Sequence, residues 1–227
     1  EFLMSHVALS PYSDTPTPPI LEYLHRRMRA KLHGFLEPLA VTLRRYKESD
    51  HSLASRYARA IAQYRKPDLG KALLLIDGLI AQHPTDPYFH ELKGQMLFEN
   101  GRIDEALKPY ETATRLLPHS AQLRAGLARI QLELNRPALL EPAIANLRAV
   151  LRKERDNSFL WRQLAIAYGR NGQMGQSALA MAEESMLKGD TSAAGYHATR
   201  AQETLPHDSA GWLKAEDVLS AVKQKKN

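Results

Sequence analysis

The residues of this chain that come nearest to a catalytic motif are His90 and Glu91. A histidine followed by a glutamate opens the zinc motif H-E-x-x-H, in which two histidines one helical turn apart hold the metal on one face of a helix. The fifth position of the motif is Gly94 here, and none of the nine histidines has another four residues away. The second ligand is therefore missing, and we expect no zinc site.

Other catalytic patterns are also missing from the sequence. It has no phosphate-binding G-x-x-x-x-G-K-[ST] loop, no G-x-S-x-G nucleophile turn and no cysteine. Without cysteine, disulfides and thiolate metal sites are excluded, although the compartment is not identified. We predict that this chain has no catalytic residue, no metal ligand and no cofactor, and that its polar residues serve another purpose.

Composition favours a helical protein with a sizeable core. The chain has 227 residues, of which 44% are hydrophobic, and no apolar run is long enough to span a bilayer. It opens with Glu1, so it is compatible with a piece of a longer protein. The formal charge of +6 is concentrated between residues 17 and 66, where eleven Lys/Arg face four Asp/Glu. No aromatic-basic interleaving accompanies this charge, so we predict a solvated helix face and not a nucleic-acid site.

Punctuation residues divide the first quarter of the chain. Residues 1–18 are rich in proline and are predicted to be an extended lead-in. Residues 19–52 are predicted to form basic helices that pack on the rest of the molecule. Their apolar residues recur at helical spacing, namely Leu21, Leu24, Met28, Leu32 and Phe35.

The region 87–118 has the most regular pattern. It reads as two amphipathic helices separated at Asn100-Gly101. Its small, aromatic and breaker residues fall at positions 8, 15, 20, 24, 27 and 32 of a unit that begins at Pro87: Gly94, Gly101, Ala106, Tyr110, Ala113 and Pro118. This pattern resembles the tetratricopeptide repeat, a helix-turn-helix unit of about 34 residues. One such hairpin cannot bury its apolar face alone, so more units are expected.

Further units can be placed on both sides of this one. The predicted units are 53–86, 87–120, 121–157, a half unit over 158–174, and 175–208, followed by a capping helix and tail over 209–227. In the third unit, residues 135–140 are predicted to be an unusually long loop. In the last two, the helix from about Met174 to Leu187 must serve both as the second helix of one hairpin and as the first of the next.

These units predict an all-α fold. We expect an α–α superhelix, that is, a tetratricopeptide-type solenoid of antiparallel helix pairs with extra N-terminal helices and a C-terminal capping helix. The small residues at the repeat positions are interpreted as packing residues, and Trp161, Tyr168 and Tyr110 as fillers between hairpins.

The resemblance to the repeat also implies where a partner would bind. In such solenoids a concave groove is lined by the first helix of each pair, and a protein or peptide segment lies in it. The implied groove residues of this chain are Tyr57, Tyr64, Arg65, Tyr88, Glu91, Gln95, Phe98, Glu99, Arg129, Glu133, Arg162 and Arg170. A solvated groove, or one filled by the chain's own N-terminal helices, is the alternative.

Several segments also resemble a particular repeat region. Tyr57-Ala58-Arg59-Ala60-Ile61-Ala62, residues 87–102, residues 161–172 and the half unit through Gly189-Asp190 look like the C-terminal repeats of BepA-like bacterial zinc metalloendopeptidases, in the HtpX/CAAX-protease superfamily. In that family a separate N-terminal domain carries the zinc motif, and this chain lacks it, so no catalytic residue can be carried over. The resemblance implies a periplasmic location, although the sequence does not exclude the cytoplasm.

Two hypotheses about function follow. The chain is either the substrate-engaging and regulatory region of such a metalloprotease, with its own protease domain as one partner, or a free-standing repeat adaptor in a bacterial envelope assembly or secretion system. An H-E-x-x-H motif upstream in the same reading frame would support the first, and a start codon near Met4 would exclude it.

Overall fold

The computed structural model describes residues 16–226, and the extended lead-in predicted over 1–18 lies mostly outside them. Within the described range the chain forms twelve helices and no strand, which confirms the all-α prediction. The chain divides into two compact units, one ending at Pro84 and the other starting at Thr85. Each unit is described by itself below.

The first unit consists of four helices. They are α2 (Pro19–Leu36), α3 (Leu39–Arg45), α4 (Leu53–Arg65) and α5 (Leu69–Gln82). Two of the helices begin with side-chain caps that satisfy otherwise unpaired amide groups. Ser52 accepts a hydrogen bond from the amide of Ser55, and Asp68 accepts one from the amide of Lys71.

Helix α2 packs on α4 through its small residues. Ala30 and Gly34 are buried, and a Cβ atom at Gly34 would lie only 2.9 Å from Cβ of Ile61. The apolar residues that the sequence suggested as a packing face are exposed in the structure, with fractions from 38% to 55%: Leu21, Leu24, Met28 and Leu32. Close approach of the two backbones selects the face that carries Ala and Gly, so the apolar stripe points elsewhere.

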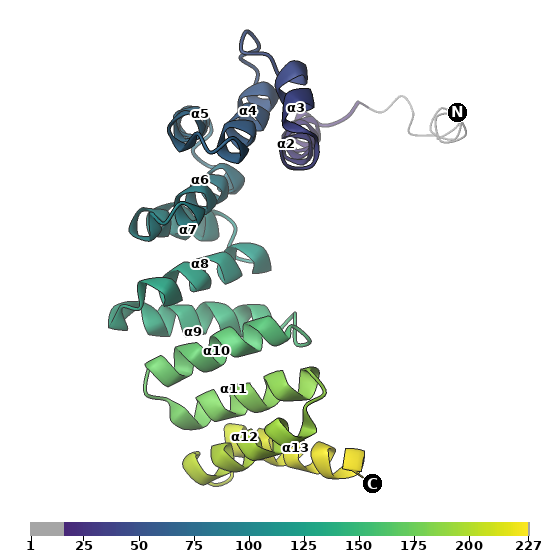
Figure 1. Cartoon of the computed structure of the whole chain (residues 1–227), viewed down its shortest axis with the longest axis vertical. Coiled ribbons are helices and arrows are strands. Elements are labelled where there is room, and N and C mark those ends of the chain that lie inside the picture. Colours follow the sequence, from purple (N-terminus) through teal and green to yellow (C-terminus); the bar gives the residue numbers. More distant parts are fainter. Residues whose placement is uncertain (1–15, 227) are drawn as a thin grey trace, which may run out of the picture. The chain divides into compact units, whose positions relative to one another are not determined.

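The second unit contains eight helices. They are α6 (Pro87–Glu99), α7 (Ile103–Leu116), α8 (Ala121–Leu134), α9 (Pro137–Leu151), α10 (Ser158–Arg170), α11 (Met174–Leu187), α12 (Thr191–Thr204) and α13 (Ala210–Lys226). Successive helices pack on one another, and Figure 1 shows α8 to α12 following one another side by side. The antiparallel hairpins match the pattern predicted from the small residues.

Three hairpin turns of this unit share one backbone conformation. Gly101, Gly172 and Gly189 have φ angles of 76°, 77° and 77°, in the left-handed region where glycine has no steric cost. In each turn the glycine amide donates to a carbonyl three residues back, and the next amide donates to a carbonyl five residues back. The turn between α11 and α12 is thus of the same kind as the turn between α6 and α7.

The third hairpin differs from its prediction. Residues 135–140 were expected to form a long loop, but α9 begins at Pro137 and only two residues separate it from α8. Proline is suited to the first helical position because its missing amide hydrogen is not needed there. The three inserted residues therefore add almost one turn to the start of α9, and Asn135 makes the tight turn with φ of 47°.

Helix α11 packs on both of its neighbours in the chain. Ala180 belongs to a core shared with α9 and α10, whereas Ala178, Leu179 and Ala182 belong to a second core with α12 and α13. Helix α13 closes this second core with Ala215, Val218 and Val222. Its polar residues Lys214, Glu216, Asp217 and Lys223 are exposed, as the sequence indicated. The division into repeat units stays a prediction.

Candidate protein-binding surface

The structure separates the predicted groove residues into structural and accessible ones. Tyr57 is fully buried in α4, so its assignment to a binding groove is wrong. Its position counts as a groove position in the repeat pattern, but the α2 helix that precedes the repeats packs on α4 in this unit. Tyr64 and Tyr88 are half-buried, at the end of α4 and the start of α6 respectively.

Two of the predicted groove arginines are bound to helix ends. Arg65 donates from Nη1 to the carbonyl oxygens of Gly34 and Glu37, at 2.6 and 2.8 Å. Arg170 donates to the carbonyl oxygen of Leu132 at 2.5 Å. The last carbonyls of a helix have no partner within it, so a guanidinium there stabilises the helix end. We therefore assign both arginines a structural role.

Glu91 is also occupied within the protein. It is 3% exposed and accepts a hydrogen bond from Nε2 of Gln122, which joins α6 to α8. Sequence reasoning placed Glu91 on the groove but missed Gln122, because the pairing becomes visible only when α8 is placed on α6. Glu91 therefore holds two first helices together and is not available to a partner.

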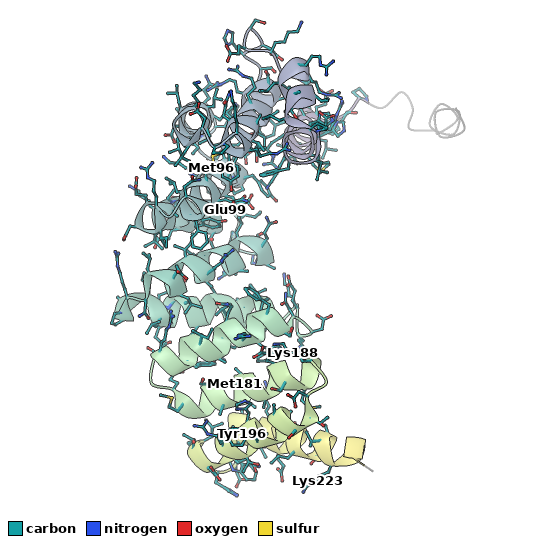
Figure 2. All side chains as sticks on the ribbon, in the orientation of Figure 1. Met96, Glu99, Met181, Lys188, Tyr196 and Lys223 are labelled. Atoms are coloured by element: carbon teal, nitrogen blue, oxygen red, sulfur yellow. The ribbon has the colours of Figure 1, made fainter. Side chains whose placement is uncertain are left out.

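The accessible part of the predicted set lies on α6 and α8. The guanidinium of Arg129 lies 4.7 Å from the centre of the Phe98 ring, in a cation–π arrangement. Gln95 donates to Glu99 at 3.0 Å on the same stretch of α6, and Figure 2 shows Glu99 at the end of that helix. Exposed Glu133 lies one turn after Arg129. An aromatic ring, an amide and charges of both signs are thus gathered on neighbouring helices.

The fourth predicted arginine lies in a different place. Arg162 is exposed on α10 and lines a pocket of about 520 Å³ between α10, α11 and the start of α12. The other lining residues are Ala165, Ile166, Gly169, Ser177, Met181, Glu184, Ser185, Lys188 and Asp190. Arg162 makes no hydrogen bond or ion pair with any residue in the described range. We call this cavity the α10/α11 pocket.

The one strongly shifted tyrosine near this surface is Tyr110 of α7. Its pKa is raised, mainly by burial and further by the carboxylates of Glu91 and Glu99, while Arg129 opposes the shift. The phenol therefore stays neutral at physiological pH. Its ring fills space between helices, which confirms the packing role that the sequence indicated.

Metal and membrane features were also sought in the described residues. No group of three or more His, Asp or Glu side chains in residues 16–226 could hold a metal ion. In the same range, none of the helices combines the length and the apolar character that crossing a bilayer requires.

Stacked antiparallel hairpins with small residues at the helix contacts define a helical repeat protein. The sequence profile described as tetratricopeptide repeat matches residues 42–188, which is more than half of the chain. The chain belongs to the tetratricopeptide repeat family.

Solved structures of MamA have a similar fold. MamA MSR-1 is 15% identical, with a TM-score of 0.60 over 75% of this chain and 96% of that one. MamA AMB-1 is 14% identical, with a TM-score of 0.60 over 74% and 93%. MamA from residue 41 to its end, from Desulfovibrio magneticus RS-1, is 16% identical, with a TM-score of 0.55 over 75% and 93%. At these identities the likeness shows the fold alone, and no curated protein matches the sequence.

Repeats of this family are protein-interaction scaffolds, because a stack of hairpins presents a long continuous surface. The comparisons give no support to the resemblance with BepA-like proteases. Neither the tetratricopeptide profile nor the MamA structures carry a protease link.

Proposed function

We propose that this chain binds a peptide or helical segment of another protein across α6 and α8. The observation that carries this proposal is the exposed arrangement of Arg129 over Phe98. Aromatic rings and arginines are the residue types that contribute most to protein interfaces, since they bury a large area and form directed contacts. The amide of Gln95 and the carboxylates of Glu99 and Glu133 would supply the polar rim.

The arrangement favours a segment with an acidic and an apolar residue. An acidic group would pair with Arg129, whose other contact is the face of an aromatic ring, so its hydrogen-bond donors remain available. An apolar side chain would cover the half-exposed ring of Phe98.

The proposal can be tested by selecting peptides from a displayed library on the immobilised chain. We expect enriched peptides whose affinity falls about tenfold or more for Arg129→Glu, which loses a charge-assisted hydrogen bond, and also falls for Phe98→Ala. Glu111→Lys, an exposed change on α7, serves as the control and should leave the affinity unchanged. No enrichment, or enriched peptides that bind all variants equally, would exclude this surface.

We infer two candidate settings for such a scaffold. One is the repeat region of a periplasmic zinc metalloprotease, with the separate protease domain as a partner. Support for it comes from the resembling segments and from the shared helix, because α11 packs on both α10 and α12. The other is an adaptor in a bacterial envelope assembly, for which the adaptor-like family membership is the support. The reading frame upstream distinguishes them: an H-E-x-x-H motif supports the protease, and a start codon near Met4 supports the adaptor.

A further inference from the structure

The hairpins α6/α7 and α10/α11 are built on one template. The starts of α10 and α6 (158 and 87) and those of α11 and α7 (174 and 103) both differ by 71 residues. The turn glycines Gly101 and Gly172 differ by the same number and have almost the same φ. Each residue of one hairpin therefore has an equivalent in the other, 71 positions away.

In the α6/α7 hairpin one face is occupied by the next helix, α8. Tyr110 lies between Gly94 of α6 and Gly126 of α8, and a Cβ atom at either glycine would lie within 2.5 Å of the ring. Thr114 donates from Oγ1 to the carbonyl oxygen of Leu123 at 3.4 Å. Together with the bond from Gln122 to Glu91, these contacts hold α8 in place.

The equivalent face of the α10/α11 hairpin is the α10/α11 pocket. Glu91, Gly94 and Thr114 correspond to Arg162, Ala165 and Ser185, and the remaining equivalents are Ile166, Gly169, Ser177, Met181, Glu184 and Lys188. Asp190, at the start of α12, completes the lining. Met181 lies in the middle of α11 and Lys188 at its C-terminal end (Figure 2). The place that α8 takes in one hairpin is thus open in the other.

Three substitutions within the template explain why α12 leaves this face open. On α7 the opposite face carries Lys108, Glu111 and Arg115, which are exposed. Their equivalents on α11 are Leu179, Ala182 and Met186, and these pack against α12 and α13. Apolar residues on this face draw the following helices to it, because burying apolar surface is favourable. The α10/α11 pocket is left without its usual helix.

We propose that the α10/α11 pocket receives an amphipathic α-helix of a partner protein, seated as α8 is seated on α6/α7. This rests on the proposed scaffold function but names a second surface and a different occupant. The helix would present glycine or alanine to Met181, because Gly126 faces the equivalent Tyr110. It would present an acidic residue to Arg162, because the equivalent Glu91 is held by the donor Gln122 and the charge is reversed here.

The other polar groups of the pocket complete the match. Glu184 is 8% exposed and accepts from Nζ of Lys188 at 2.5 Å, so this pair is internally neutralised. Asp190 caps α12 by accepting from the amide of Ala193. Arg162 is therefore the one charge in the pocket that needs a partner, and Ile166 and Met181, 36% and 37% exposed, supply the apolar contact.

The test uses a helix taken from the chain itself. The probe is a fluorescent, lactam-stapled peptide with the sequence of residues 120–135, in which Gln122 is replaced by glutamate to face Arg162. Binding to the full chain is measured by fluorescence anisotropy. We expect the probe to bind, Met181→Glu to abolish binding, and Arg162→Glu to weaken it about tenfold or more. A probe with Gln122→Lys should restore binding to the Arg162→Glu chain.

Three controls make the result specific. Lys108→Glu, on the exposed face of α7, should not change the affinity. A probe with Gly126→Leu should bind poorly, because a large side chain would meet Met181. Melting temperatures of the Arg162→Glu and Met181→Glu chains should equal that of the unmodified chain, because both side chains are exposed.

Several outcomes would overturn the inference. They are no binding of the glutamate probe at millimolar concentration, binding that survives Met181→Glu, or binding that responds to Arg129→Glu and not to Arg162→Glu. Concentration-dependent dimerisation of the chain that Met181→Glu abolishes would make a second copy the occupant and would also exclude it. Library peptides that depend on Arg129 would keep the proposed function even if this probe fails.

Discussion

The ring of Tyr110 occupies the space above Gly94, where a Cβ atom would lie 2.4 Å from Cδ2 of the ring. Alanine at Gly94 must therefore push the ring toward Gly126, which is equally close on the other side. We expect Gly94→Ala to lower the free energy of unfolding by about 1–3 kcal/mol, the usual cost of overpacking. Urea denaturation measures the change.

A glycine in open surroundings is the matched control. At Gly195 of α12 a Cβ atom would meet only Val222, at an ordinary distance of 3.6 Å. Gly195→Ala should be neutral or stabilising by about 0.5–1 kcal/mol, because alanine has the higher helix propensity. Equal effects at Gly94 and Gly195 would show that Tyr110 does not fill the space between the helices.

Four arginines at predicted groove positions should fall into two classes. Arg65→Ala and Arg170→Ala leave helix-end carbonyls without a donor, and we expect each to destabilise its unit by about 1–2 kcal/mol. Arg129→Ala and Arg162→Ala should change stability by less than about 0.5 kcal/mol, because both side chains are exposed. Thermal unfolding of the four variants distinguishes the classes, and a uniform loss would contradict the division.

The turn glycines allow a test of the shared helix. Alanine at Gly172 or Gly189 is forced into the left-handed region at a cost of about 1–2 kcal/mol. If α11 ends in the same kind of turn as α10, the two variants should lose similar stability. Gly70→Ala in α5 is the control, since it lies in a helix and meets only Asp68 at 3.9 Å. A loss at Gly172 without one at Gly189 would contradict the equivalence.

Glu183 should make stability depend on pH. Burial raises its pKa, Lys214 opposes the shift and Asp217 adds to it. The folded state therefore holds the proton more tightly than the unfolded state, where the pKa is about 4.5. This contribution to stability is fully present below pH 4.5 and is lost as the pH rises through the raised value.

The measurement compares Glu183→Gln with the unmodified chain. Glutamine cannot ionise, so the difference in melting temperature in its favour should be larger at pH 7 than at pH 4. A difference that is the same at both pH values would show that Glu183 ionises freely in the folded protein.

The helices were largely predictable from the sequence, whereas the contacts between them were only partly so. The bounds of α4 and α6 follow from caps, proline and helical spacing, which are local properties. Tyr57 and Arg65 were misassigned because their roles depend on α2, whose docking face was chosen by Ala30 and Gly34 and not by the larger apolar residues. The long loop at 135–140 failed because proline can start a helix as well as end one.

The α10/α11 pocket was missed for a related reason. A single arginine of it, Arg162, was predicted from its repeat position, but Ser177, Met181 and Glu184 stand at positions that usually pack in the core. A signal was present in the sequence: polar residues stand at Ser177 and Glu184, where the second unit has Ala106 and Ala113. The fixed spacing of 71 residues would have revealed it.

The shared use of α11 has a consequence for the way this protein unfolds. In a repeat array, partial unfolding stops at the weakest interface between neighbouring units. Helix α11 contributes to the core with α10 and to the core with α12 and α13, so no such interface exists between α10 and α13. We expect the amides of these four helices to exchange hydrogen with solvent in one cooperative step, which would make them a single folding element longer than one repeat.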